Sequence, residues 1–532
     1  MFQGRAILFV FLLGGLFCGI NTAFASRSSD AVQDLLQTFQ NRRAAREAEA
    51  KMLGITLPSS AEGFSIKEFD MKEYRRSSKS VAIDTVTGDA SCEDTFASKV
   101  QAGCESCDED KIEDKIEAKI EDEAEAEASP VLMPLPKGLD LWQNERLRSA
   151  EKGWEYEFSY TGEYIRVLNN YGQKRKSVYL DNLSLSLDID LEKAGIARNG
   201  NFFVSMLGNS GGNITGDHLD NSGIGRIGDL QVVSNIEANE SFRLYEFFFE
   251  KPFGRGKLLL GLRDMNADFY ASEFGGFFTN SSFGIGPDVA QNATVSIFNV
   301  TAPTIRFSYQ LNDDLMVQCA LIDGNPGSAD DNRNGLGLRV SSDEGFFGIV
   351  EAQYTQRFLG KDLDGTLKLG TWKHSGKFDD VINTDAAGNP VVRDGNWGTY
   401  AVVDQKLWVR KSNPDSHIGG FIQVGGLNPT DRSGIEKYYG GGLVFNGPFA
   451  ERPQDCFGIA INMAETNSRT RDFNVASGQT GLTKERVLEA DYSYQVNDWL
   501  TVKPYLQVIK NVGGDPGRDQ TRVFGLRFNS LF

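Results

Sequence analysis

The side chains that most often bind metals or act as nucleophiles are few in this sequence and far apart. Its three histidines, His218, His374 and His417, each lie more than four residues from any other histidine and from any cysteine. No Walker A phosphate loop occurs in the chain. Because metal and phosphate sites need such groups at fixed short spacings, we expect no metal, no cofactor and no enzymatic activity.

Two short motifs have a spacing that is used in chemistry. Cys104-Glu-Ser-Cys107 is a CxxC, but no second CxxC and no nearby histidine completes a zinc site. We interpret it as a local disulfide or a pair of free thiols in an exported chain. Gly223-Ile-Gly-Arg-Ile-Gly228 matches GxGxxG, yet it lies in a polar stretch that opens no helix, so it does not predict dinucleotide binding.

The first 25 residues have the features of a secretory signal peptide. Arg5 supplies the positive charge, Ala6 to Ile20 are apolar, and Ala23-Phe24-Ala25 fits the small-x-small cleavage rule. We therefore expect residues 1–25 to direct export. No later stretch is apolar over the length of a membrane-spanning helix, which excludes a helical membrane protein.

Three further regions follow the predicted signal peptide. Residues 26–57 predict a short helix, because their apolar residues recur at helical spacing. Residues 58–136 are predicted to be an acidic linker with a Lys-Ile-Glu repeat, and half of the net charge of −18 lies between residues 105 and 127. So acidic a chain is not expected to bind nucleic acid. Residues 137–532 are the predicted β-barrel domain.

From residue 154 onward, polar and apolar residues alternate. In one run, Leu183, Leu185 and Leu187 point to one side, while Ser184 and Ser186 point to the other. This period of two predicts strands with one apolar face and one polar face. Similar runs recur to the end of the chain, without a strong amphipathic helix between them.

Closure into a membrane barrel explains these runs best. A long open sheet would leave unpaired edges, which lipid does not tolerate. At roughly 20–25 residues for each strand and its connection, the domain predicts an all-β, transmembrane, antiparallel barrel of about 16 strands. A barrel of this size encloses an aqueous channel. The fixed repeat of a soluble propeller or β-helix is not found in the sequence.

The chain ends on an aromatic residue of the apolar parity. Phe532 shares that parity with Phe524, Leu526 and Phe528. We interpret Phe532 as the signal that the barrel-insertion machinery reads. The predicted location is the outer membrane of a Gram-negative bacterium, where lipid surrounds the barrel and the N-terminal region lies in the periplasm.

Several segments of residues 139–532 resemble one family, the OprB-type carbohydrate-selective porins. They include Leu244-Tyr-Glu-Phe-Phe-Phe-Glu250, Gly256-Lys-Leu-Leu-Leu-Gly-Leu-Arg263 and Gly441-Gly-Leu-Val-Phe-Asn-Gly447. The order and spacing of these segments carry the resemblance. It implies a sixteen-stranded, commonly trimeric channel that passes sugars passively. The acidic linker departs from the short N-terminal segment that is usual in that family.

A sugar channel needs hydrogen-bonding groups and flat apolar surfaces at its narrowest point. Inward parity and loop position suggest ten candidates for lining the channel and contacting sugar. They are Glu246, Glu250, Arg263, Asp268, Arg306, Arg333, Arg339, Glu351, Trp372 and Trp408. The alternative for each of them is that it only keeps the lumen hydrated.

The predicted function is passive diffusion of small carbohydrates, monosaccharides or short oligosaccharides, into the periplasm. The expected partners are these solutes, outer-membrane lipid, the insertion machinery and two further copies of the chain in a homotrimer. Two alternatives stay open. One is a non-specific porin for small solutes, and the other is a structural barrel whose acidic linker tethers another envelope component.

Overall fold

The computed structural model describes residues 139–169, 177–211, 214–215, 227–328, 332–337, 340, 344–357, 359–360 and 363–532. The predicted signal peptide, N-terminal helix and acidic linker therefore lie outside the described residues. The same holds for the CxxC motif, for His218 and for the candidate Arg339.

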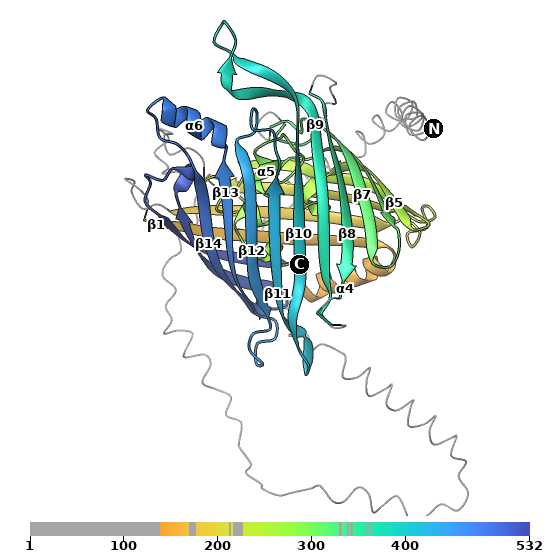
Figure 1. The fold of residues 1–532 in the computed structure, drawn as a ribbon. Coiled ribbons are helices and arrows are strands. Elements are labelled where there is room, and N and C mark those ends of the chain that lie inside the picture. Colours follow the sequence, from red (N-terminus) through yellow and green to blue (C-terminus); the bar gives the residue numbers. More distant parts are fainter. Residues whose placement is uncertain are drawn as a thin grey trace, which may run out of the picture. The chain divides into compact units, whose positions relative to one another are not determined.

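Sixteen strands pair antiparallel with their neighbours in the sequence, and the last strand pairs with the first (Figure 1). The strands are β1 (Trp154–Asn169), β2 (Ser177–Asp190), β3 (Asn201–Gly211), β4 (Ser241–Phe253), β5 (Gly256–Arg263), β6 (Ala302–Gln310), β7 (Leu315–Asp323), β8 (Phe346–Gln356), β9 (Gly365–Thr384), β10 (Pro390–Arg410), β11 (Asn413–Gly426), β12 (Ile435–Asn446), β13 (Cys456–Thr466), β14 (Lys484–Asn497), β15 (Leu500–Lys510) and β16 (Thr521–Leu531). The α-helices in the described ranges are α4 (Leu139–Glu151), α5 (Pro287–Ala290) and α6 (Ser468–Ala476). The closed barrel predicted from the alternating sequence is confirmed, with the expected number of strands.

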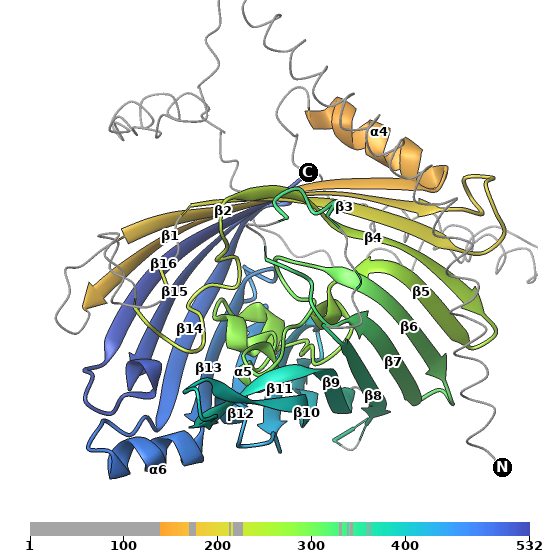
Figure 2. The same cartoon turned by 90° about the horizontal axis from the view of Figure 1, so that it is seen from above.

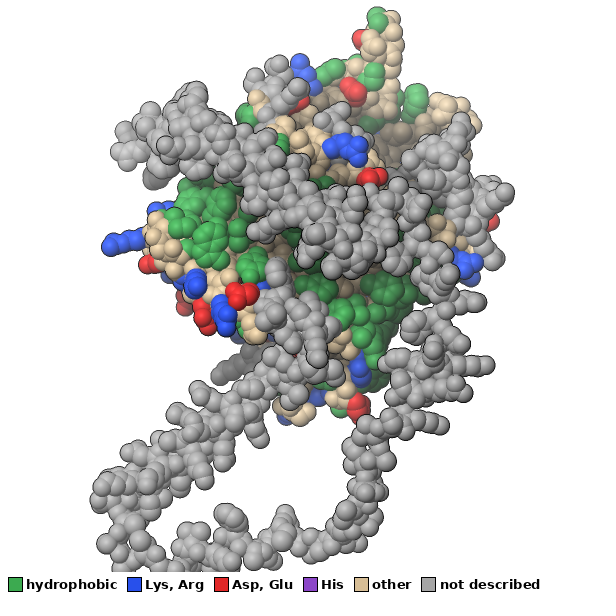
Figure 3. Space-filling model, turned by 180° about the vertical axis from the view of Figure 1, so that it is seen from behind, with side chains coloured by type: hydrophobic (Ala, Val, Ile, Leu, Met, Phe, Trp, Pro, Cys, Tyr) green, Lys and Arg blue, Asp and Glu red, His purple; other side chains and the backbone are tan. Residues whose placement is uncertain are grey.

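The alternation of residue types becomes an alternation of faces. In β1, Ile165 is fully buried on the inner side, whereas the adjacent Tyr164 is 38% exposed on the outer side. Pairing of β1 with β2 places Phe158 opposite Leu185, so outward apolar side chains meet across the strands. Figure 3 shows hydrophobic side chains gathered on one outer face, with charged ones toward its margins. Such a surface suits contact with lipid. No helix in the described ranges is both long enough and apolar enough to cross a bilayer.

The two ends of the barrel differ in the length of their connections. At one end the strands are joined by 254–255, 411–412 and 498–499, and at the other by 212–240 and 264–301. Outer-membrane barrels carry short turns on the periplasmic side and long loops on the outer side. The end with the short turns is therefore the periplasmic one. There the backbone N–H of Phe532 donates to Phe158 O at 2.8 Å, and its ring stacks on Trp499 with centroids 5.6 Å apart.

Two of the long connections fold back into the barrel. We call residues 227–240 the first inserted segment and residues 264–301 the second. Looking down on the barrel, Figure 2 shows α5 of the second segment inside the ring of strands. The two segments bind each other, because the N–H of Asn235 donates to Thr279 O at 2.9 Å and that of Ser281 donates to Val232 O at 3.0 Å.

Apolar clusters hold these segments against the inner wall. Phe269 and Tyr270 of the second segment pack in one cluster with Phe347 of β8 and Trp372 of β9. Val233 of the first segment packs in another with residues of β1, β2 and β14 to β16. A third cluster joins phenylalanines of the second segment to β11, β12 and β13. Among the described residues, these clusters draw on every strand except β3, β4 and β5.

The seam between the first and last strands carries a buried ion pair. Arg527 of β16 lies with Nη2 2.5 Å from Oε2 of Glu163, which is directly opposite it in β1. Ser234 of the first inserted segment donates its hydroxyl to the same Glu163 oxygen at 2.9 Å and accepts from Arg527 Nη2 at 3.2 Å. The inserted segment therefore contacts both strands of the seam.

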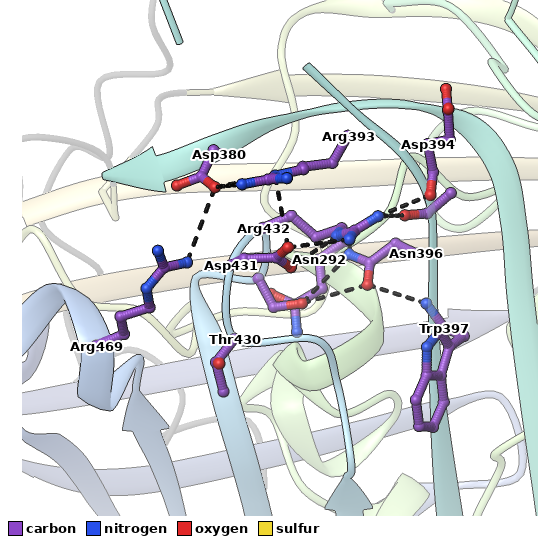
Figure 4. A network of polar contacts seen from close by, with 12 residues as sticks. Asn292, Asp380, Arg393, Asp394, Asn396, Trp397, Thr430, Asp431, Arg432 and Arg469 are labelled. Atoms are coloured by element: carbon purple, nitrogen blue, oxygen red, sulfur yellow. Dashed lines mark hydrogen bonds and ion pairs between the residues drawn. The ribbon is translucent and has the colours of Figure 1, made fainter. Parts of the chain in front are cut away.

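On the outer side, β9 and β10 extend beyond their neighbours as a long hairpin (Figure 1). Arg393 of β10 donates from Nε and Nη2 to Asp380 Oδ2 of β9, at 3.0 and 2.7 Å. Asp431, in connection 427–434, lies 3.5 Å from Arg393, and Arg469 of α6 lies 3.8 Å from Asp380. Figure 4 shows these side chains converging from three parts of the chain. The network fastens the hairpin to two neighbouring loops.

Candidate functional site

Charged residues face the lumen on β4 and β5, which the apolar clusters leave uncovered, and on the neighbouring β6. Glu246 and Glu250 lie on the inward face of β4, Arg263 ends β5, and Arg306 lies on β6 next to them. A β-bulge in β4 at Tyr245 separates Glu246 from Leu244 in the register with β3. This bulge allows Glu246 to face inward while Leu244 pairs with the outward Met206.

One glycine lets β4 and β5 approach closely beneath these charges. Gly261 has a φ of +150°, and a Cβ there would lie 2.1 Å from the carbonyl oxygen of Phe247. Glycine is therefore required where β5 passes Phe248. Because the two strands lie so close together, the side chain of Arg263, two residues later, lies over β4.

The charged groups form a continuous ladder. Arg263 donates from Nη1 to Glu246 Oε1 at 3.0 Å, and from Nε and Nη2 to the two carboxylate oxygens of Asp268 at 2.8 and 3.1 Å. Arg306 binds the same Asp268 carboxylate with Nη1 and reaches Glu250 Oε2 with Nη2 at 2.5 Å. We call these five residues the lumen ladder. They are five of the sequence candidates, and the structure brings them into contact.

A sixth candidate joins the ladder indirectly. Glu351 of β8 accepts from the side chain of Gln318 at 3.0 Å, and Gln318 also donates to the carbonyl oxygen of Asp268 at 2.7 Å. Glu351 further accepts from the N–H of Tyr270 at 3.0 Å and from Tyr400 Oη at 2.6 Å. Because Glu351 is fully buried, it holds the second inserted segment rather than facing the lumen.

Two aromatic rings complete the inward face of the ladder, and neither is among the ten candidates predicted from the sequence. Phe203 of β3 and Phe248 of β4 stack with centroids 5.0 Å apart, and the Arg263 guanidinium lies 4.9 Å above the Phe248 ring. Both rings are half-buried. The signal was present, because Phe248 stands midway between Glu246 and Glu250 and so shares their parity.

The ladder side chains are partly accessible from the lumen. The side chains of Arg263 and Arg306 are 17% and 12% exposed, and that of Glu250 is 20% exposed. Three carboxylates face two guanidinium groups, so the ladder carries one net negative charge. Paired charges of this kind present hydrogen-bond donors and acceptors side by side. A neutral molecule can bind to them without disrupting the ion pairs.

The structure places Trp372 and Arg333 away from the ladder. Trp372 faces inward but is 1% exposed, because it stacks on Phe347 beneath the second inserted segment. Arg333 is exposed in the outer connection 332–337, where Nη2 donates to Glu240 O at 3.1 Å. Arg339 lies outside the described residues.

The inward position expected for Trp408 is wrong. A β-bulge between Lys406 and Trp408 shifts the register of β10, so that Trp408 pairs with Ile418. Ile418 is outward, because the next residue on β11, Gly419, stands against Phe274 inside the barrel. Trp408 is accordingly 48% exposed on the outer face. Trp408 lies close to the periplasmic turn 411–412, where outer-membrane barrels carry aromatic residues at the membrane boundary.

Comparison with known proteins agrees with this geometry. Residues 174–532 match the family described as carbohydrate-selective porin, OprB family. Porin B of Pseudomonas aeruginosa is 27% identical over 417 residues, which cover 74% of this chain and 90% of that protein. The putative porin QuiX of Acinetobacter baylyi is 21% identical, over 74% of this chain and 92% of its own length.

The fold also resembles a solved structure. The high-pH structure of Pseudomonas putida OprB superimposes with a TM-score of 0.65 at 23% identity, over 74% of this chain and 97% of the other. The matched region includes the whole ladder, because the family match begins before β2 and runs to the last residue. This chain therefore belongs to the OprB family of carbohydrate-selective porins and is a β-barrel of the Gram-negative outer membrane.

Proposed function

We propose that the lumen ladder, together with Phe203 and Phe248, selects small carbohydrates as they diffuse through this outer-membrane channel. The observation that carries the proposal is the position of Arg263. Its guanidinium lies over an aromatic ring while it binds two carboxylates, at the wall of β4 and β5, on which none of the three apolar clusters draws. A sugar presents hydroxyls around a flat apolar ring face, and this arrangement offers a partner for each.

Passage through such a site needs binding that is weak. Every charged group of the ladder already has a partner of opposite sign. A sugar hydroxyl therefore replaces a water molecule at the ladder and does not satisfy an unpaired charge. The site then favours sugars over other neutral solutes of the same size without trapping them. The proposed solutes are monosaccharides and short oligosaccharides.

Sugar block of ion current tests this function. In planar bilayers, glucose or maltotriose should lower the conductance of the wild-type channel in a saturable way. The Phe248→Leu and Arg263→Gln substitutions should each raise the half-blocking concentration about threefold to tenfold, since each removes one weak contact. Phe247→Leu is the matched control, because Phe247 packs on Phe202 on the outer face.

Two results would contradict the proposal. Block by sugars that equals block by amino acids of matched size would favour a non-specific porin. A Phe247→Leu channel that loses as much sugar affinity as Phe248→Leu would mean that the ladder strands act only through barrel stability.

The absence of enzymatic activity is part of the proposal. Gly208-Asn209-Ser210-Gly211-Gly212 has the spacing of a nucleophile elbow, GxSxG, in which the serine stands at a turn between a strand and a helix. Ser210 instead lies on β3 and donates its hydroxyl to Asp181 Oδ1 at 2.7 Å on the outer face. Incubation with lipid or ester substrates should give no turnover above that of a Ser210→Ala variant.

We further propose a homotrimer, and recognition of Phe532 by the barrel-insertion machinery. The resemblance to OprB-type porins supports the first, and the stacking of the Phe532 ring on Trp499 at the periplasmic end of the seam supports the second. Mass measurement of the detergent-solubilised protein tests the trimer. Deletion of Phe532 should lower the amount of folded barrel in the outer membrane, while refolding in detergent proceeds.

A further inference from the structure

Four basic side chains stand on the outward face of adjacent strands at the outer end of the barrel. They are Arg486 of β14, Lys510 of β15, Arg522 of β16 and Arg166 of β1. We call these four residues the basic quartet. Each lies within the first three or the last four residues of its strand, on the side of the long connections.

Their neighbours establish that these side chains point outward. Glu485, Ile509, Thr521 and Ile165, which precede them in the chain, are all fully buried on the inner side. Since successive residues of a strand face opposite sides, the quartet faces away from the lumen. Three of the four side chains are exposed and Arg486 is half-buried.

The register brings the quartet together. Arg486 is directly opposite Lys510, and Arg522 is opposite Val508, two residues from Lys510. Arg166 is opposite Phe524, two residues from Arg522. The four charges therefore follow one another across four neighbouring strands, at spacings of opposite and diagonal partners.

Among the described residues, no carboxylate forms an ion pair with any member of the quartet. The Arg522 guanidinium donates to the neutral side-chain amide oxygen of Gln520. Other outer-end lysines differ in this respect, because Lys437 and Lys484 lie 3.7 and 3.9 Å from Glu465. In a chain with a net charge of −18, four neighbouring cations without a carboxylate partner form an unusual surface.

An apolar surface lies immediately below the quartet. Leu488, Phe524 and Tyr164 each stand two residues deeper than a quartet member on the same outward face, and they are 45%, 37% and 38% exposed. Leu506, opposite Phe524, is 41% exposed. From the outer rim toward the middle of the membrane, the lipid-facing surface is thus first cationic and then hydrophobic.

We propose that the basic quartet binds the phosphate groups of a phosphorylated glycolipid in the outer leaflet, with its acyl chains along Leu488, Leu506 and Phe524. The charge and the vertical order match such a lipid, whose anionic headgroup sits above its chains. Arginine and lysine bind phosphate through charge-assisted hydrogen bonds, and basic residues at an anionic membrane surface are attracted to its headgroups.

The alternatives fit this surface less well. A second copy of the chain docked in a two-fold contact through this face would bring cation against cation, whereas the three-fold contacts of the proposed homotrimer join two different faces and are distinguished by the mass measurement below. Free phosphate would use the charges but leave the apolar strip without a partner. Only a lipid uses both parts.

The test compares lipid binding by two charge-matched variants of the full-length protein. The quartet variant is R166Q, R486Q, K510Q and R522Q combined. The control variant removes the same charge from the periplasmic turns, as K193Q, R255Q, R357Q and K411Q. The probe is diphosphoryl lipid A in nanodiscs or mixed micelles, with dephosphorylated lipid A and inorganic phosphate as the two comparison ligands, and binding is read by native mass spectrometry.

We expect the quartet variant to bind diphosphoryl lipid A at least tenfold more weakly, and the control variant to bind like wild type. Wild type should prefer the diphosphoryl form to the dephosphorylated form, and inorganic phosphate should not compete at equal concentration. Ion conductance and sugar block should stay unchanged in both variants, which shows that each barrel is folded.

Three outcomes would overturn the proposal. They are equal lipid binding by the quartet and control variants, equal affinity for phosphorylated and dephosphorylated lipid, and full competition by inorganic phosphate. A quartet variant whose mass in detergent changes, while its lipid binding does not, would assign the surface to a contact between copies of the chain.

Discussion

Arg263 holds Asp268 through both carboxylate oxygens, at 2.8 and 3.1 Å, and so ties the end of β5 to the segment that enters the lumen. Asp268 is only five residues further along the chain, yet it also binds Arg306 on the next strand. One carboxylate therefore balances two guanidinium groups in the proposed solute path. Its charge should control which ions the channel prefers.

Substitution Asp268→Asn should shift ion selectivity toward anions. The ladder then carries no net charge instead of one negative charge, and both arginines lose a carboxylate partner. At separations of a few ångströms in partly hydrated surroundings, one charge changes local ion energies by about 1 kcal/mol or more, so the cation-to-anion permeability ratio should fall roughly twofold or more. The reversal potential in a KCl gradient measures this ratio. Asp313→Asn, at an exposed site in a periplasmic turn, should leave it unchanged.

Substitution Gly261→Ala should destabilise the barrel. The added Cβ would meet the Phe247 carbonyl oxygen at 2.1 Å and the Phe248 Cα at 2.5 Å, so β4 and β5 would have to separate. Such overpacking costs about 1–3 kcal/mol, and the folded barrel should be lost at a lower temperature on heating in detergent. Gly276→Ala is the control, since nothing lies within 4 Å of its added Cβ. Equal heat resistance of the two variants would argue against the close approach.

Docking of the first inserted segment should weaken as pH rises. Burial, together with the nearby Asp229, raises the pKa of Glu237 to about 8 from an ordinary value of 4.5. Between these two values the docked carboxyl keeps its proton while the undocked one loses it, so the undocked state becomes favoured with rising pH. Above about pH 8 the effect is complete.

Hydrogen exchange of the amides in residues 230–236 measures this docking. After correction for the intrinsic exchange rate, protection at pH 8.5 should be about tenfold or more below that at pH 5. Glu237→Gln should remove much of the difference, whereas Glu240→Gln, at an exposed position in the same segment, should retain it. A wild-type protein with the same protection at both pH values would refute the prediction.

Substitution Asp380→Asn should loosen the outer hairpin of β9 and β10. The Asp380 side chain is fully buried and accepts both hydrogen bonds from Arg393, so its charge holds the guanidinium in place. Amides of residues 381–392 should exchange about tenfold faster, because a charge-assisted bond contributes on the order of 1.5 kcal/mol or more. Asp379→Asn, at the exposed neighbouring position on β9, should have little effect. Unchanged exchange in D380N would mean that strand pairing alone holds the hairpin.

The barrel could be predicted from the sequence because its signal is local. Each strand repeats the same alternation, and the inner or outer side of Glu246, Glu250, Arg263 and Arg306 follows from counting by two. Residue parity also reveals Phe248 once the ladder is known. The physical reason is that in a closed barrel the side chains of every strand alternate between lumen and lipid. A wrong assignment in one strand therefore does not change the assignment in the next.

Predictions failed where a local irregularity or a distant segment intervened. The bulge before Trp408 turned that side chain outward, and no feature of the alternating pattern marks the position. Trp372 has the expected parity, but the second inserted segment, about a hundred residues earlier in the chain, covers it. Such coverage depends on packing between parts of the chain that are far apart, which residue spacing does not record.

The buried pair at the seam has a consequence for assembly. A slip of one residue between β1 and β16 would turn either Glu163 or Arg527 toward lipid and leave its partner as an isolated charge inside. Ser234 hydrogen-bonds to Glu163 and to Arg527, and it can make these two bonds only when the strands pair in the correct register. The first inserted segment thus stabilises only the barrel in which β1 and β16 pair in the native register. It therefore favours correct closure over a slipped register when β16 pairs with β1.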